Sequence, residues 1–122
     1  GTPPYASPLQ IANLARLFPR ATIILAHCGL REMWRDALLA AEELENVWLG
    51  IPGPPLTAIQ QVVDRLGPDR IIYGSDGGIG HPSAISYALK IVDELRLGDD
   101  AREKILGGNI ARLLGVKEER RG

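Results

Sequence analysis

Three short apolar runs recur along the chain at equal spacing, and each is rich in β-branched residues. The runs occupy residues 22–26, 46–51 and 70–74. Their first apolar members, Ile23, Val47 and Ile71, lie 24 residues apart. Nearly every position in these runs is apolar, which is typical of strands buried on both faces of a parallel sheet. The pattern therefore predicts three parallel strands.

Helical patterns fill the gaps between these runs and continue after the last one. Ser7 followed by Pro8 predicts the start of the first helix, and Pro19 follows its end. Gly67 is expected to end the third helix and Ser83 to cap the fourth. Helices are expected over residues 8–17, 33–44, 56–66, 83–95, 99–106 and 109–114. The predicted buried face of the fourth comprises Ile85, Ala88, Leu89, Val92 and Leu95. The only loose loop is expected at residues 52–55.

This alternation of strands and helices predicts an α/β fold with a parallel sheet. A repeat of this length fits either a (β/α)₈ TIM barrel or an open doubly wound sheet. Three strands cannot close a barrel, and an open three-stranded sheet leaves two unpaired edges. We therefore expect residues 1–122 to form a single α/β unit that pairs with a missing half of the fold or with another copy of itself.

Composition narrows the class of partner and the cellular location. The 14 Lys and Arg residues nearly balance the 15 Asp and Glu residues, so no nucleic-acid partner is expected. No apolar run approaches the ~20 residues that cross a bilayer, so no membrane partner is expected either. A single cysteine, Cys28, excludes an intrachain disulfide and favours a cytoplasmic location. Because the only methionine is Met33, we expect a processed protein or a piece of a longer one.

Two strands end in residues that could carry chemistry. His27 follows the first predicted strand, and Asp76 follows the third, just before two glycines. Ligands and catalytic groups gather at the carboxyl ends of parallel strands, and imidazole and carboxylate are zinc ligands. We therefore predict that His27 and Asp76 belong to a metal site. The structural alternatives are a half-buried histidine and an Asx turn.

Three details qualify this site. His27 is four positions from Ile23, whereas Asp76 is five from Ile71, which indicates either different layers of side chains or a strand start misplaced by one residue. His81 could face a substrate, but an exposed loop histidine explains it as well. Cys28 is expected to be a small buried filler.

Four motifs in order resemble the amidohydrolase-related metal-dependent hydrolases, in the branch that contains aminocarboxymuconate-semialdehyde decarboxylase. The motifs are residues 18–29, 45–49, 69–76 and 105–114. They are spread over most of the chain, from residue 18 to residue 114, and they match the C-terminal part of the family.

The resemblance implies a partial (β/α)₈ barrel made of the last three β/α units and the C-terminal helices. It implies that Asp76 holds a divalent metal, with zinc expected, or the attacking water and shuttles its proton. It implies that His27 orients or activates the water or polarises a small-molecule substrate. The reaction implied is hydrolysis of a C–N or C–O bond, or decarboxylation of a carboxylate substrate. Asn109 is expected to act structurally, as the N-cap of the closing helix.

The chain departs from the family pattern in its metal ligands. The family carries a His-x-His pair and a further histidine before the sixth strand, whereas His27 and His81 are the only histidines here. A catalytic zinc normally takes three protein ligands. We therefore expect a fragment that is inactive alone and that associates with the missing N-terminal half or forms a homo-oligomer.

Two alternatives stay open at this stage. Gly74, Gly77, Gly78 and Gly80 precede a helix that starts near Ser83, as in a small phosphate- or nucleotide-binding module. These glycines fit G-x-G-x-x-G poorly, however, and the nearby carboxylate would repel a phosphate. The second alternative is a catalytically inactive half barrel that only self-associates.

Overall fold

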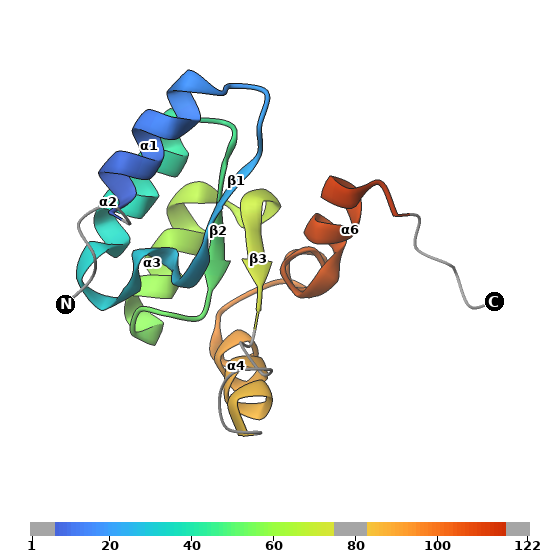
Figure 1. Cartoon of the computed structure of the whole chain (residues 1–122). Helices are drawn as coiled ribbons and strands as arrows, with labels where there is room; N and C mark the ends of the chain where they lie inside the picture. Colours follow the sequence, from blue (N-terminus) through green and yellow to red (C-terminus); the bar gives the residue numbers. More distant parts are fainter. Residues whose placement is uncertain (1–6, 75–82, 117–122) are drawn as a thin grey trace.

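The computed structural model describes residues 7–74 and 83–116 of the chain (Figure 1). All three strands are present and start at the predicted residues, Ile23, Val47 and Ile71. They form one parallel sheet in the order β1-β2-β3. The elements are α1 (Pro8–Leu17), β1 (Ile23–Leu25), η2 (Ala26–Gly29), α2 (Leu30–Glu43), β2 (Val47–Ile51), α3 (Leu56–Leu66), η3 (Pro68–Arg70), β3 (Ile71–Tyr73), α4 (Ser83–Glu94), α5 (Asp99–Glu103), η4 (Lys104–Gly108) and α6 (Asn109–Leu114).

The strands are staggered along the sheet. Ile23 of β1 pairs with Val47 at the start of β2, whereas Ile71 at the start of β3 pairs with Leu49, two residues further along β2. Closing a sheet into a barrel requires such a shift in register between strands. The equal spacing in sequence therefore does not place the three strand ends at the same level.

One face of the sheet is covered by helices and forms the core. Val47, Leu49 and Ile51 alternate along β2 and are buried on this face. They belong to one cluster with apolar side chains of α2 and α3, among them Leu38 and Ile59. In Figure 1, α1, α2 and α3 lie together on one side of the strands. The predicted apolar faces of α2 and α3 are thus confirmed as core. The apolar pattern of α1 predicts a buried face that includes Leu9, Leu14 and Leu17, and this prediction is wrong, since all three are exposed and only Pro8, Ala12 and Ala15 of this helix are buried.

The other face of the sheet is only partly covered. Ile24 in β1 is 43% exposed, and its register partner Trp48 in β2 is half-buried. The guanidinium of Arg112 in α6 lies 5.7 Å from the centre of the Trp48 ring, within the range of a cation–π contact. This face of the β1–β2 pair is therefore covered less than the helix-packed face.

Polar side chains secure the loops that enter β2 and β3. The Asn46 amide, just before β2, donates hydrogen bonds to the carbonyl oxygens of Ala15, Phe18 and Ala21, with distances of 2.9 to 3.2 Å. Arg70, just before β3, donates to the carbonyl oxygens of Leu44 and Val47. Main-chain oxygens outside the sheet ladder are thereby satisfied. These contacts hold the amino ends of the strands together.

The C-terminal helices differ from the prediction in how they connect. The predicted break before Asn109 is absent, because Gly108 and Asn109 both have right-handed helical dihedral angles and η4 joins α5 to α6. Asn109 is therefore not the N-cap, and that prediction is wrong. Its side chain is 1% exposed and donates to the carbonyl oxygens of Pro68 and Ile71, at 2.5 and 2.8 Å. The predicted end of the helix is confirmed, since Gly115 has a φ of 70°.

The predicted buried face of α4 is only partly right. Ala88, Val92 and Leu95 are buried, but Ile85 and Leu89 are 48% and 38% exposed. The reason is that no described element lies beyond α4 to cover that side of the last β/α unit.

Exposed apolar side chains concentrate at the two ends of the layer. The large ones are Leu9, Leu14, Leu17, Phe18, Ile24, Leu39, Ile85, Tyr87, Leu89, Leu114 and Val116. They lie in α1, β1, α2, α4 and α6 or directly after α1 and α6, whereas the described residues of β2, α3 and β3 contribute none. Within the described residues, the middle unit is thus covered on both sides, whereas the first and last units each have a neighbour on one side.

No helix within residues 7–74 and 83–116 is both long enough and apolar enough to cross a membrane.

Candidate functional site

His27 lies in a tight turn at the carboxyl end of β1. The turn, η2, places His27 and Cys28 in left-handed backbone conformations, with φ of 56° and 49°. Two successive non-glycine residues in this region are uncommon, and such strain concentrates at functional sites. The local geometry therefore supports a special role for this segment.

The turn also changes the direction of the chain at His27, the first of the two residues whose offsets differ in the sequence. Strict alternation along β1 would place His27 on the same helix-covered face as Leu25. The left-handed turn breaks that alternation: Cys28 becomes fully buried while His27 is half-buried. The strand starts themselves are confirmed, so a misplaced start is excluded.

The loop after β2 packs directly on His27. The His27 Nδ1 lies 3.3 Å from the carbonyl oxygen of Pro52. A Cβ atom on Gly53 would lie 2.6 Å from the His27 carbonyl carbon and 2.9 Å from its Cα, closer than real Cβ atoms come. The expectation of a loose loop at residues 52–55 is therefore wrong. A glycine flanked by prolines directly after a buried strand, at residues 52–54, is the sequence signal that indicates this close contact.

The end of β3 continues the same edge of the sheet. The backbone N–H of Gly74 donates to the carbonyl oxygen of Ile51 at 2.9 Å, which extends the β2–β3 pairing beyond Tyr73. Asp76 and His81 lie outside the described residues. Their predicted roles therefore stay predictions, as does the proposed role of His27 at a metal.

The described residues do not by themselves fit a complete metal site. Among them, no group of three or more His, Cys, Asp or Glu side chains is close enough to hold an ion. A catalytic zinc takes three protein ligands. His27 is the one histidine within the described ranges, so it could supply at most one imidazole ligand.

Cys28 anchors the turn and is confirmed as a buried filler. Its side chain is fully buried, and burial raises the pKa of the thiol from 9.0 to about 12. The thiol therefore stays protonated at neutral pH and is a poor nucleophile. It contributes packing beneath His27.

The buried thiol gives a testable prediction. At pH 8, we expect folded protein to react with iodoacetamide about a thousandfold more slowly than urea-unfolded protein, since a pKa about three units higher lowers the thiolate fraction by that factor. For the same reason, the free energy of unfolding should fall as pH rises from 9 to 12, because only the unfolded chain releases this proton there. Mass spectrometry after timed quenching measures the first effect, and equal labelling rates would contradict it.

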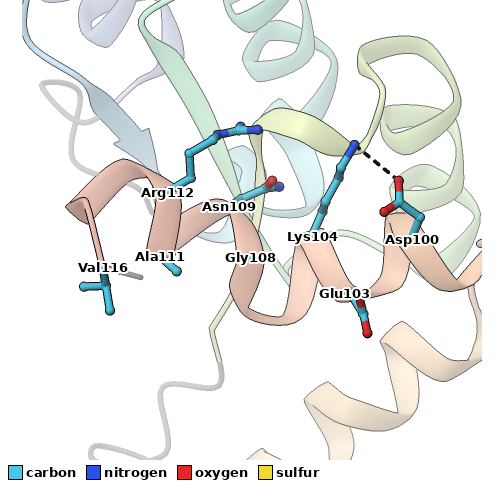
Figure 2. Close-up of a pocket in the computed structure, with 8 residues that line it drawn as sticks. All are labelled: Asp100, Glu103, Lys104, Gly108, Asn109, Ala111, Arg112 and Val116. Atoms are coloured by element: carbon cyan, nitrogen blue, oxygen red, sulfur yellow. Dashed lines mark ion pairs between the residues drawn. The ribbon is translucent and has the colours of Figure 1, made fainter. Parts of the chain in front are cut away.

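A cavity of about 480 Å³ lies at the opposite end of the strands, beside the segment that enters β3 (Figure 2). The Lys104 ammonium pairs with the Asp69 and Asp100 carboxylates at 3.0 and 3.4 Å, and this lysine lowers the pKa of Asp69. Figure 2 shows Lys104, Asn109 and Arg112 pointing to the same side of the helical stretch. At the amino ends of barrel strands, such contacts serve stability rather than catalysis. The candidate site therefore remains at the carboxyl ends, around His27.

Three parallel strands with a register shift between them, and with α1, α2 and α3 on one side, fit part of a TIM barrel, in which the helices form a ring outside the strands. The amidohydrolase family model Amidohydro_2 matches residues 3–116. The chain belongs to this amidohydrolase family, as its four motifs predicted, and its parent fold is that of an amidohydrolase-like enzyme. No curated protein sequence matches it.

Solved structures confirm the fold. An uncharacterised TIM-barrel protein from Bordetella bronchiseptica is 25% identical, with a TM-score of 0.71 over 91% of this chain and 40% of its own. An amidohydrolase from Burkholderia multivorans with bound zinc is 20% identical, with a TM-score of 0.66 over 90% and 49%. The 5-carboxyvanillate decarboxylase of Sphingomonas paucimobilis is 21% identical, with a TM-score of 0.61 over 87% and 37%.

The chain spans less than half the length of each of these structures, between 37% and 49%. With three parallel strands and their helices, it has the fold of a partial TIM barrel. The predicted fold class is confirmed.

Proposed function

We propose that the chain is the distal part, the last three β/α units, of a metal-dependent hydrolase or decarboxylase that acts on a small molecule. The observation that carries this proposal is the strained turn that holds His27 at the carboxyl end of β1, in a chain of the amidohydrolase family. The scissile group would be a C–N or C–O bond or a carboxylate.

In this proposal His27 and Asp76 work at the same edge of the sheet. His27 orients or polarises water or substrate, and Asp76 holds the metal or the attacking water and accepts its proton. A divalent ion, with zinc expected, would lower the pKa of bound water. The zinc in the Burkholderia structure and the decarboxylase activity named for the Sphingomonas protein support this range of chemistry. Further ligands would come from other β/α units.

We also propose that the preceding β/α units of the barrel are the partner of this chain. In the described part of the chain, β1 and β3 each pair on one edge. The other edges would pair with the outer strands of the preceding units, whose helices would cover exposed residues of α1 and α4, such as Leu17 and Ile85. An unpaired strand edge with adjacent apolar surface favours association. Without that half we expect the chain to be inactive and to self-associate.

The proposal is tested by the metal content of two proteins: the 122-residue chain and a longer protein that carries it behind the missing units. We expect about one zinc per molecule of the longer protein, a strong loss of zinc in its Asp76→Asn variant, and little zinc on the isolated chain. A longer protein that turns over substrate with no divalent ion would overturn metal dependence. Asp36→Asn, on the exposed face of α2, is the matched control.

No observation on the described residues favours the alternative of a phosphate- or nucleotide-binding module. It depends on glycines from residue 77 to 80, which lie outside the described residues, and the family match favours a hydrolase. The cytoplasmic location remains a prediction from the cysteine content.

A further inference from the structure

We infer that Pro52 and Gly53 are positioning residues that fix His27 in one tautomer, with the hydrogen on Nδ1 and the lone pair on Nε2. The inference deepens the proposed function, on which its catalytic meaning rests. Both residues lie in the loop between β2 and α3.

The hydrogen bond itself determines the tautomer. The Nδ1 atom of His27 lies 3.3 Å from the Pro52 carbonyl oxygen. A carbonyl oxygen can only accept, so Nδ1 must donate its hydrogen. In a neutral imidazole the other nitrogen, Nε2, then carries the lone pair. Nε2 is therefore the nitrogen that can accept a proton or bind a metal.

Gly53 makes this contact sterically possible. A Cβ atom at this position would come within 2.6 Å of the His27 carbonyl carbon and 2.9 Å of its Cα. Both atoms belong to the backbone, so neither can rotate away. Any side chain at position 53 would push the loop off the turn and lengthen the bond from Pro52.

The turn also contacts the core and β2, on the side away from the loop at residues 52–55. Cys28 is fully buried, and a Cβ on Gly50 would be in ordinary van der Waals contact with the Ala26 Cα at 3.4 Å, so η2 lies against β2. The left-handed conformations of His27 and Cys28 are thus held between the core and the loop. Strained backbone conformations persist at functional sites only where the surrounding structure holds them in place in this way.

The test is the nitrogen NMR spectrum of the histidine rings, recorded without metal or substrate on ¹⁵N-labelled protein at a pH where imidazole is neutral. The chain has only two histidines, and His81→Gln identifies the His27 signals. We expect a protonated Nδ1 and an unprotonated Nε2. In Gly53→Ala we expect the Nε2–H form, which free histidine prefers, to become the major species.

Gly107→Ala is the matched control, because a Cβ there meets no atom within 4 Å. Its His27 signals should equal those of the unmodified protein. An unmodified protein with hydrogen on Nε2 would overturn the inference, and so would an unchanged tautomer in folded Gly53→Ala. If Gly53→Ala does not fold, the spectrum of the unmodified protein alone decides. This readout needs neither metal nor turnover, so its failure is distinguishable from failure of the proposed function.

Discussion

Replacing Asn109 by alanine is expected to lower the free energy of unfolding by about 3 kcal/mol. The Asn109 amide is buried and donates to the carbonyl oxygens of Pro68 and Ile71. Without it, two acceptors at the entrance of β3 lose their partner, and leaving a buried acceptor unsatisfied costs about 1–3 kcal/mol. The Asn109 Oδ1 atom has no partner within the described part of the chain, so its removal costs little. Urea denaturation followed by circular dichroism measures the change.

Asn13→Ala is the control for this substitution. Asn13 is exposed on α1, and its side chain accepts one hydrogen bond from Arg16. Its removal should change stability by less than about 0.5 kcal/mol. If Asn109→Ala lost no more than Asn13→Ala, Asn109 would not be what fastens the C-terminal helices to the sheet.

The strands and most helices could be predicted because local signals and burial agree for them. Val47 and Leu49 lie in an apolar run that is covered by helices, and Ser7 accepts a hydrogen bond from the backbone N–H of Gln10, as an N-cap should. The exposure of Ile85 and Leu89 could not be predicted, because the periodicity of α4 shows which residues are apolar and not whether a neighbour exists to cover them.

Asn109 shows a second limit of sequence reasoning. An asparagine after two glycines is a typical N-cap signal, and the prediction followed that local rule. The structure instead uses its amide for contacts with Pro68 and Ile71, about forty residues earlier in the chain. A long-range hydrogen bond leaves no periodic pattern in the sequence. That Asn109 is structural could therefore be predicted, but neither the kind of contact nor its partners could.

For the candidate site, the sequence pointed to His27 but not to the residues that hold it. Catalytic residues gather at the carboxyl ends of parallel strands, so the location of His27 after β1 could be predicted. The left-handed turn and the approach of Gly53 depend on how two loops pack, which no spacing in the sequence encodes. Similarly, the 24-residue period hid the two-residue stagger between β2 and β3, because spacing along the chain does not fix register between strands.

In the longer protein that completes the barrel, Asp76→Asn is expected to lower kcat by about 10²–10⁴-fold, the usual contribution of a general acid–base group. Asparagine keeps the size of the side chain and its ability to form an Asx turn, but it cannot accept a proton from attacking water or ligate a metal as a carboxylate does. The free energy of unfolding should therefore stay within about 0.5 kcal/mol of the unmodified protein. Turnover assays with amides, lactones and aromatic carboxylates, paired with urea denaturation, measure both quantities.

The pairing of the two measurements separates the proposed role from the structural alternative. If Asp76 served only to make a turn, Asp76→Asn would leave both activity and stability unchanged, whereas Asp76→Ala would lower stability. If it serves the chemistry, both variants lose activity while Asp76→Asn stays folded. Asp36→Asn, a carboxylate exposed on α2, should change neither quantity. Full activity in Asp76→Asn would remove Asp76 from the site and leave His27 as the one predicted catalytic group whose surroundings the structure describes.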